Sequence, residues 1–68
     1  MAQKLAGQLA AFLRRKRGSL TYLQFSKKVG LSDSTLQRLE QGDQNVTIKT
    51  LEQMLKRLRC RISDVFPD

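Results

Sequence analysis

The sequence predicts an all-α fold, a compact bundle of five short helices in a single domain over residues 1–68. Three observations predict it. Apolar residues recur at spacings of three and four, no stretch shows a convincing period of two, and residues that cap or stop helices separate the stretches. A chain of this length buries only ~60% of the surface that its unfolded form exposes, so we expect a small core.

The first expected helix carries an apolar stripe. Leu5, Leu9 and Leu13 stand four residues apart, and the helix should end near Arg17, since Gly18 follows. Its last four residues, 14–17, are all basic. Such a run is typical of a nucleic-acid contact, but it is equally typical of a helix C-terminus, where cations are favoured.

The second and third helices are separated by a very short connection. Thr21 is a plausible N-cap for a helix over residues 22–29, and Gly30 ends it. Ser32 can cap the next helix, which continues until Gly42. The apolar residues that should face the core are Tyr22, Phe25, Val29, Leu36 and Leu39.

The fourth and fifth helices complete the chain. Thr47 can cap a regular helix over residues 48–58, and a last short element at 62–66 is closed by Pro67. Cys60, between them, is expected to be a small reduced residue, with a redox switch as the alternative. The apolar sets are Ile48, Leu51, Met54, Leu55 and Leu58 in the fourth helix, and Ile62, Val65 and Phe66 in the fifth, which either cover the core or form half of a dimer seam.

Composition narrows the function. Thirteen Lys and Arg against six Asp and Glu leave a net charge of +7, without a histidine. This excess points to polyanionic partners, nucleic acid first and anionic membrane second. The single cysteine fits a reducing compartment, so we expect a cytoplasmic protein. We expect no cofactor, no metal, no membrane span and no enzymatic activity, because the sequence shows no metal-ligand cluster, nucleophile motif or long apolar run.

Residues 22–41 fit a helix-turn-helix motif, with Gly30 in the turn and the small Ser26 where two helices cross. The runs LTYLQFSKKVGLSDSTLQRLEQG and NVTIKTLEQML lie in register with this motif. In both runs the sequence resembles the Xre family of phage repressor and Cro-like regulators, from about Leu9 to Phe66. The resemblance implies a compact, five-helix, lambda-repressor-like domain that binds double-stranded operator DNA, commonly as a homodimer on a palindrome.

The resemblance also implies roles by position. Glu40 matches one half of an ion pair with Arg15 that ties the first helix to the third. Relatives often pair through the end that holds Ile62, Val65 and Phe66. The positions implied to touch DNA are Asp33, Ser34 and Arg38 at base edges, Gln37 nearby, Ser32 and Gln41 at the backbone, Tyr22 at the start of the second helix, and Gln44 and Asn45 in the loop after the third.

The chemistry of these side chains suits a major groove. Arg38 can donate two hydrogen bonds to guanine, and Gln37 can pair with both edge groups of adenine. Asp33 can accept a hydrogen bond from the amino group of cytosine or instead cap the helix N-terminus. Tyr22 offers a hydroxyl to phosphate or only a packed ring. The exposed Lys27 and Lys28 either touch the DNA backbone or remain in solvent.

We therefore expect a sequence-specific regulator of transcription, a repressor that binds a palindromic operator as a dimer. The alternative is an antitoxin-type module that uses the same fold to hold a partner protein and regulates its own operon. A cationic peptide that lies on membranes is a third possibility, disfavoured because the sequence contains no Trp and its apolar stripes require one another.

Overall fold

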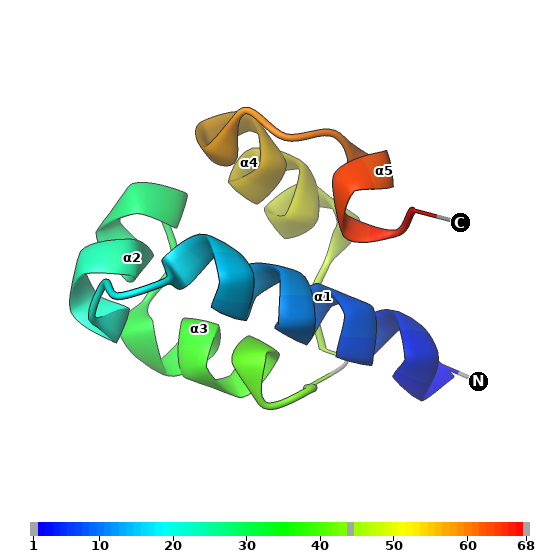
Figure 1. The fold of residues 1–68 in the computed structure, drawn as a ribbon, viewed down its shortest axis with the longest axis horizontal. Helices are drawn as coiled ribbons and strands as arrows, with labels where there is room; N and C mark the ends of the chain where they lie inside the picture. Colours follow the sequence, from blue (N-terminus) through cyan, green and yellow to red (C-terminus); the bar gives the residue numbers. More distant parts are fainter. Residues whose placement is uncertain (1, 44, 68) are drawn as a thin grey trace.

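The computed structural model describes residues 2–43 and 45–67 and confirms the predicted all-α fold. Its elements are α1 (Ala2–Arg17), α2 (Tyr22–Val29), α3 (Asp33–Glu40), α4 (Ile48–Leu58) and α5 (Ile62–Val65), and the described residues form no strand. The long α1 packs on α3 and α5, and α2 packs on α3 and α4. In Figure 1, α3 lies below α1, α4 and α5 lie above it, and α2 closes one end.

The helices begin where capping chemistry places them. The hydroxyl of Thr21 accepts a hydrogen bond from the backbone N-H of Gln24 at 3.1 Å, and the Gln24 side chain accepts one from Thr21 N-H at 3.0 Å. Ser32 and Thr47 each accept from the N-H three residues ahead, at 3.2 and 3.1 Å. These bonds satisfy donors that a helix N-terminus leaves free, so they fix where α2, α3 and α4 start.

The core draws side chains from every helix. Each helix turns one apolar stripe inward and leaves its remaining side chains in solvent, as a small bundle requires. The buried apolar cluster consists of Leu9, Phe12 and Leu13 from α1, Phe25 and Val29 from α2, Leu36 and Leu39 from α3, Met54 and Leu55 from α4, and Val65 from α5.

Three residues of the predicted apolar sets lie outside this core, namely Leu5, Ile48 and Ile62. Leu5 is 54% exposed, because the single turn of α5 covers only part of the N-terminal half of α1. Ile48 is 77% exposed and is the first residue of α4, ahead of the turns that pack on the bundle. Periodicity indicates which face of a helix is apolar, but the neighbouring helices decide how far along that face burial extends.

Candidate nucleic-acid interface

The turn between α2 and α3 fixes the angle of the helix-turn-helix unit. Gly30 adopts a φ of +80°, a left-handed conformation that costs glycine little. The N-H groups of Gly30 and Leu31 both donate to the carbonyl of Ser26, at 2.8 and 3.1 Å. Ser26 is buried, and its hydroxyl donates to the carbonyl of Leu23 at 2.9 Å. The backbone therefore reverses within two residues and leads directly into α3.

One face of α3 is polar and open to solvent. Leu36 and Leu39 are fully buried in the core, so the opposite side of the helix faces solvent. Gln37 lies half-buried at the margin of that side. The residues that stand exposed on α3 or directly beside its ends are Ser32, Asp33, Ser34, Arg38 and Gln41. The structure thus brings the expected base-reading and flanking residues together on one short helix.

Hydrogen bonds hold part of this face in place. The Ser32 hydroxyl donates to the Thr35 hydroxyl at 2.8 Å, and a terminal nitrogen of Arg38 lies 3.5 Å from the same Thr35 oxygen. On its other side, Nε of Arg38 lies 3.9 Å from a carboxylate oxygen of Asp43. The Arg38 side chain remains 65% exposed. The guanidinium is therefore oriented by its neighbours while its donors stay accessible to a ligand.

The N-cap of α3 is Ser32 and not Asp33. Ser32 makes the capping hydrogen bond, and Asp33 occupies the first turn of α3, where the helix dipole favours an acid. Its side chain is exposed, and within residues 2–43 and 45–67 it takes part in no side-chain hydrogen bond or ion pair. The carboxylate therefore stands free to accept a hydrogen bond from outside the protein.

The positions that flank α3 differ in how open they are. Tyr22 is half-buried, and the guanidinium of Arg17 lies 4.3 Å from the centre of its ring, so the ring is packed. Asn45 is exposed, and its backbone N-H donates to the Asp43 carboxylate at 2.9 Å. Asp43 thus orders both the loop and Arg38, a role that its loop position alone did not reveal. Gln44 lies outside the described residues.

The expected ion pair between Arg15 and Glu40 is wrong by two residues. Glu40 is 2% exposed, and its two carboxylate oxygens accept hydrogen bonds from Nε of Arg17 at 3.1 and 3.0 Å. Arg15 is exposed instead. The reason is helical geometry: Arg17 follows the buried Leu13 by four residues and shares its face, whereas Arg15 follows it by two and points to the opposite side.

Arg17 and Arg14 together join α1 to the end of α3. Arg14 donates to the backbone carbonyl of Glu40 at 2.6 Å, and Arg17 also donates to the carbonyl of Leu20 at 3.1 Å. Hydrogen bonding to the Glu40 carboxylate raises the pKa of the Arg17 guanidinium, so Arg17 stays charged at every physiological pH. Two arginines of the basic run therefore support the polar helix from behind.

Comparison with known protein families agrees with this architecture. Residues 13–65, most of the chain, match the model of a family described as Helix-turn-helix. The chain belongs to this Xre-type helix-turn-helix family. It is a family of DNA-binding regulators of transcription and not a family of enzymes. No curated protein and no solved structure matches the chain significantly. None of the helices described in residues 2–43 and 45–67 is long and apolar enough to cross a membrane.

In this helix-turn-helix protein the three residues of the expected dimer interface differ in burial. Val65 is 2% exposed and belongs to the core, so in this fold it is not available to a second copy. Ile62 is 52% exposed, and Phe66 is half-buried. Phe66 also borders a mainly apolar groove of about 290 Å³ between the N-terminal half of α1 and the start of α4, lined by Leu5, Ala6, Leu9, Asp43, Val46, Leu51 and Phe66. Of the three predicted seam residues, Ile62 and Phe66 therefore offer apolar surface.

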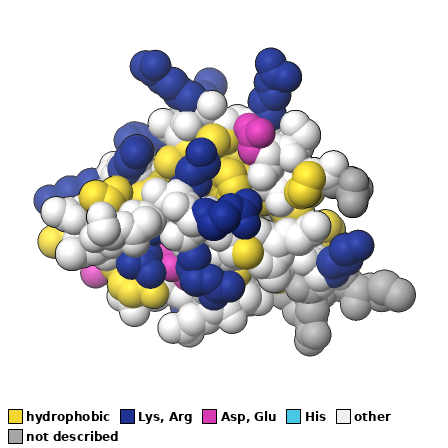
Figure 2. Space-filling model, viewed as in Figure 1, with side chains coloured by type: hydrophobic (Ala, Val, Ile, Leu, Met, Phe, Trp, Pro, Cys, Tyr) yellow, Lys and Arg dark blue, Asp and Glu magenta, His cyan; other side chains and the backbone are white. Residues whose placement is uncertain are grey.

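The positive charge of this Xre-type protein is spread over its surface. Figure 2 shows Lys and Arg side chains over most of the visible face, with few acidic ones, and several project from the upper edge, where α4 and α5 lie. The charge is thus not confined to α3. It provides a field that attracts a polyanion from any direction, and local geometry must decide where that polyanion is held.

Proposed function

We propose that this protein is a sequence-specific repressor that inserts α3 into the major groove of double-stranded operator DNA. The observation that carries this proposal is the exposed polar face of α3, with the Arg38 guanidinium held open between Thr35 and Asp43. A helix in the major groove needs donors and acceptors at base edges, and two buried leucines must anchor its other side. α3 has both.

The roles of the side chains follow from their position and chemistry. Arg38 suits a paired contact to guanine, Gln37 a paired contact to adenine, and the free carboxylate of Asp33 the amino group of cytosine. Ser34 lies between them and can bond to either kind of group. The residues proposed for the DNA backbone are Ser32 and Gln41 at the ends of α3, Tyr22 at the start of α2, and Gln44 and Asn45 in the loop that follows α3.

We also propose that the protein acts in the cytoplasm as a homodimer on a palindromic operator, with residues 1–68 as one helix-turn-helix unit. One copy presents a recognition helix of only eight residues, and a second copy doubles the number of bases read. A dimer on an operator acts as a repressor by occupying the site that transcription requires. Ile62 and Phe66 supply the apolar surface for pairing, together with the neighbouring groove.

A second function rests on that same apolar surface. An antitoxin-type module would use the groove at Leu5, Leu51 and Phe66 to hold a partner protein, and would bind its own operator with α3. Co-purification from the native host separates the two. A stoichiometric partner that depends on Leu5 and Phe66 would favour the antitoxin, and a homodimer alone would favour the repressor.

The experiment that tests the main proposal is selection from a random duplex library at near-physiological salt, with wild type beside Arg38→Ala. We expect a palindrome with half-sites about one helical turn apart, ~34 Å. Arg38→Ala should weaken binding by ~1–3 kcal/mol and relax one base position, because a paired base contact is lost.

Arg15→Ala is the matched control, since it removes the same charge from an exposed site on α1. It should leave the selected sequence unchanged. Equal weakening of Arg38→Ala on all sequences would make Arg38 a phosphate ligand and not a base reader. If wild type enriches no sequence at all, the proposed function is wrong.

A further inference from the structure

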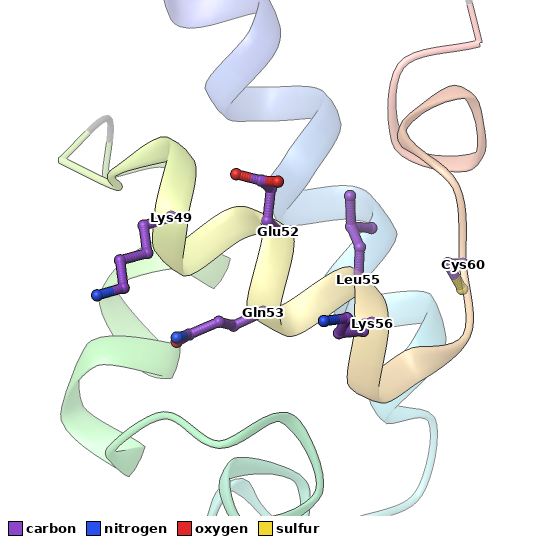
Figure 3. A pocket seen from close by; sticks show the side chains of 6 residues that line it. All are labelled: Lys49, Glu52, Gln53, Leu55, Lys56 and Cys60. Carbon is purple, nitrogen blue, oxygen red and sulfur yellow. The ribbon is translucent and has the colours of Figure 1, made fainter.

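The outer face of α4 carries a row of basic and amide side chains that the recognition helix does not use. Lys49, Gln53, Lys56 and Arg57 are all exposed, and their spacing of i, i+4, i+7 and i+8 places them on one face of α4. We call these four residues the α4 ridge. Figure 3 shows Lys49 and Gln53 reaching from the same side of the helix, while the carboxylate of Glu52 points away from them.

The α4 ridge borders two hollows. One, of about 430 Å³, is shown in Figure 3 and is lined by Lys49, Glu52, Gln53, Leu55, Lys56 and Cys60. The other, of about 330 Å³, is lined by Gln53, Lys56 and Arg57 together with Val29, Gly30 and Leu31. The second hollow thus joins the α4 ridge to the turn of the helix-turn-helix motif. Ser32, the cap of the recognition helix, is the next residue along the chain.

Arg57 is seated on that turn. A Cβ atom at Gly30 would lie 2.7 Å from Nε of Arg57, so the arginine side chain lies close against the turn. Lys27 and Lys28, both exposed, immediately precede Val29 at the same hollow. The charges of α4 and of the end of α2 therefore converge beside the start of α3.

The charges of the α4 ridge take part in no ion pair in the described part of the chain. The ion pairs found there are Arg17 with Glu40 and Arg38 with Asp43, and neither involves the ridge. The helix dipole favours Lys56 and Arg57 in the last turn of α4. It disfavours Lys49, which stands in a first turn that contains no acid. The helix dipole therefore accounts for Lys56 and Arg57 but not for Lys49, and cations at both ends of one exposed face suit a long anion.

We propose that the α4 ridge binds the phosphate backbone of the same duplex that α3 reads, as a contact that strengthens binding without reading sequence. This inference rests on the proposed function of α3. Lys, Arg and Gln side chains are common ligands of DNA phosphates. The continuity of the ridge with the α2–α3 turn places it at the edge of the DNA site. A membrane surface fits less well, because the ridge contains no apolar or aromatic side chain to insert.

The test compares the salt dependence of duplex binding for wild type and the double variant Lys56→Gln/Arg57→Gln. Each phosphate contact contributes ~0.9 to the slope of log K against log salt concentration. Loss of two contacts should lower that slope by about 2, on the selected operator and on random duplex alike. The sequence selected from a library should not change, since the α4 ridge reads no bases.

One control and one further ridge variant make the result specific. Lys4→Gln/Arg61→Gln removes the same charge from exposed sites on α1 and before α5, and it should change the slope by less than one unit. Lys49→Gln/Lys56→Gln leaves Arg57 on Gly30 undisturbed, so it tests the ridge even if the first variant unfolds.

The outcomes separate this inference from the proposed function. If wild type selects an operator but the ridge variants keep its salt slope, the α4 ridge does not bind DNA and α3 still does. If a ridge variant changes the selected sequence, the ridge reads bases and the inference is also wrong. If wild type binds no duplex, both proposals fail.

Discussion

At the scale of single residues, the buried carboxylate of Glu40 defines what supports α3. A charge with 2% exposure is costly without a partner, and Arg17 supplies that partner from α1. Arg17→Gln should therefore lower the melting temperature clearly, because it removes the guanidinium that donates to the buried Glu40 carboxylate. Arg15→Gln is the matched control, and as a surface change it should alter stability by no more than about 0.5 kcal/mol. Thermal unfolding of both variants measures the difference.

The same pair makes a prediction about pH. The pKa of Arg17 is raised in the folded protein, so its contribution to stability is fully present below the pKa of the unfolded chain and is lost only as pH rises through the folded value, far above neutrality. The stability difference between wild type and Arg17→Gln should therefore stay constant between pH 7 and 10. Equal melting temperatures for Arg17→Gln and Arg15→Gln would show that the ion pair of Arg17 with Glu40 does not contribute to stability.

At the scale of elements, α4 ends in an unusual way. Arg59 is the C-cap residue of α4 and has a φ of +56°. Among the described residues it is the one non-glycine residue with a positive φ. Glycine is common at such a position. The left-handed conformation costs an L-residue ~1–2 kcal/mol. Arg59→Gly should therefore stabilise the protein, by up to about 1 kcal/mol once the greater freedom of glycine in the unfolded chain is included. Chemical denaturation measures the change in the free energy of unfolding.

Arg61→Gly is the control for this substitution, since it removes the same side chain from a residue with a φ of −101°. There glycine brings no relief of strain and adds freedom to the unfolded chain, so this variant should lose stability. Opposite signs for the two variants are the diagnostic result. A loss of stability in both would show that the Arg59 side chain contributes more than its backbone costs.

The elements were predictable from the sequence because their ends depend on local chemistry. Thr21, Ser32 and Thr47 carry the hydroxyls that cap α2, α3 and α4, and Gly30 has the conformational freedom that the turn requires. The partner of Glu40 was harder to predict, since four basic residues follow one another and only distance from Leu13 distinguishes them. That signal was present in the sequence, and it is the four-residue spacing to Arg17.

At the scale of the whole molecule, the sequence could not show which residues of the last element the core takes. α5 has four residues, which make one helical turn. One turn has too few positions for periodicity to distinguish residues that cover the core from residues that face a second copy. The α4 ridge was hidden for a related reason. Its residues are visible as a basic stretch, but their place beside the α2–α3 turn depends on how α2 packs on α4.

Assembly is the property of the whole molecule that remains to be measured. Each copy carries a charge of +7, so two copies repel one another at low ionic strength, and in the proposed homodimer the apolar surface at Ile62 and Phe66 would have to overcome that repulsion. Salt screens exposed charges, with a Debye length of ~10 Å at 0.1 M. Homodimerisation should therefore strengthen as salt rises from 50 to 300 mM, whereas DNA binding should weaken. Sedimentation without DNA measures the first effect and duplex titration the second.

Ile62→Glu should abolish the homodimer, because it places a charge in the centre of the proposed seam. Val65 is unsuitable for this purpose, since its substitution would disturb the core. Leu23→Glu is the matched control: Leu23 is 56% exposed on α2, and the same charge there should leave association unchanged. Wild type could stay monomeric at all salt concentrations and still bind a palindrome cooperatively. That result would mean that two copies associate only when both are bound to DNA. Equal association of both variants with wild type would place the seam elsewhere on the molecule.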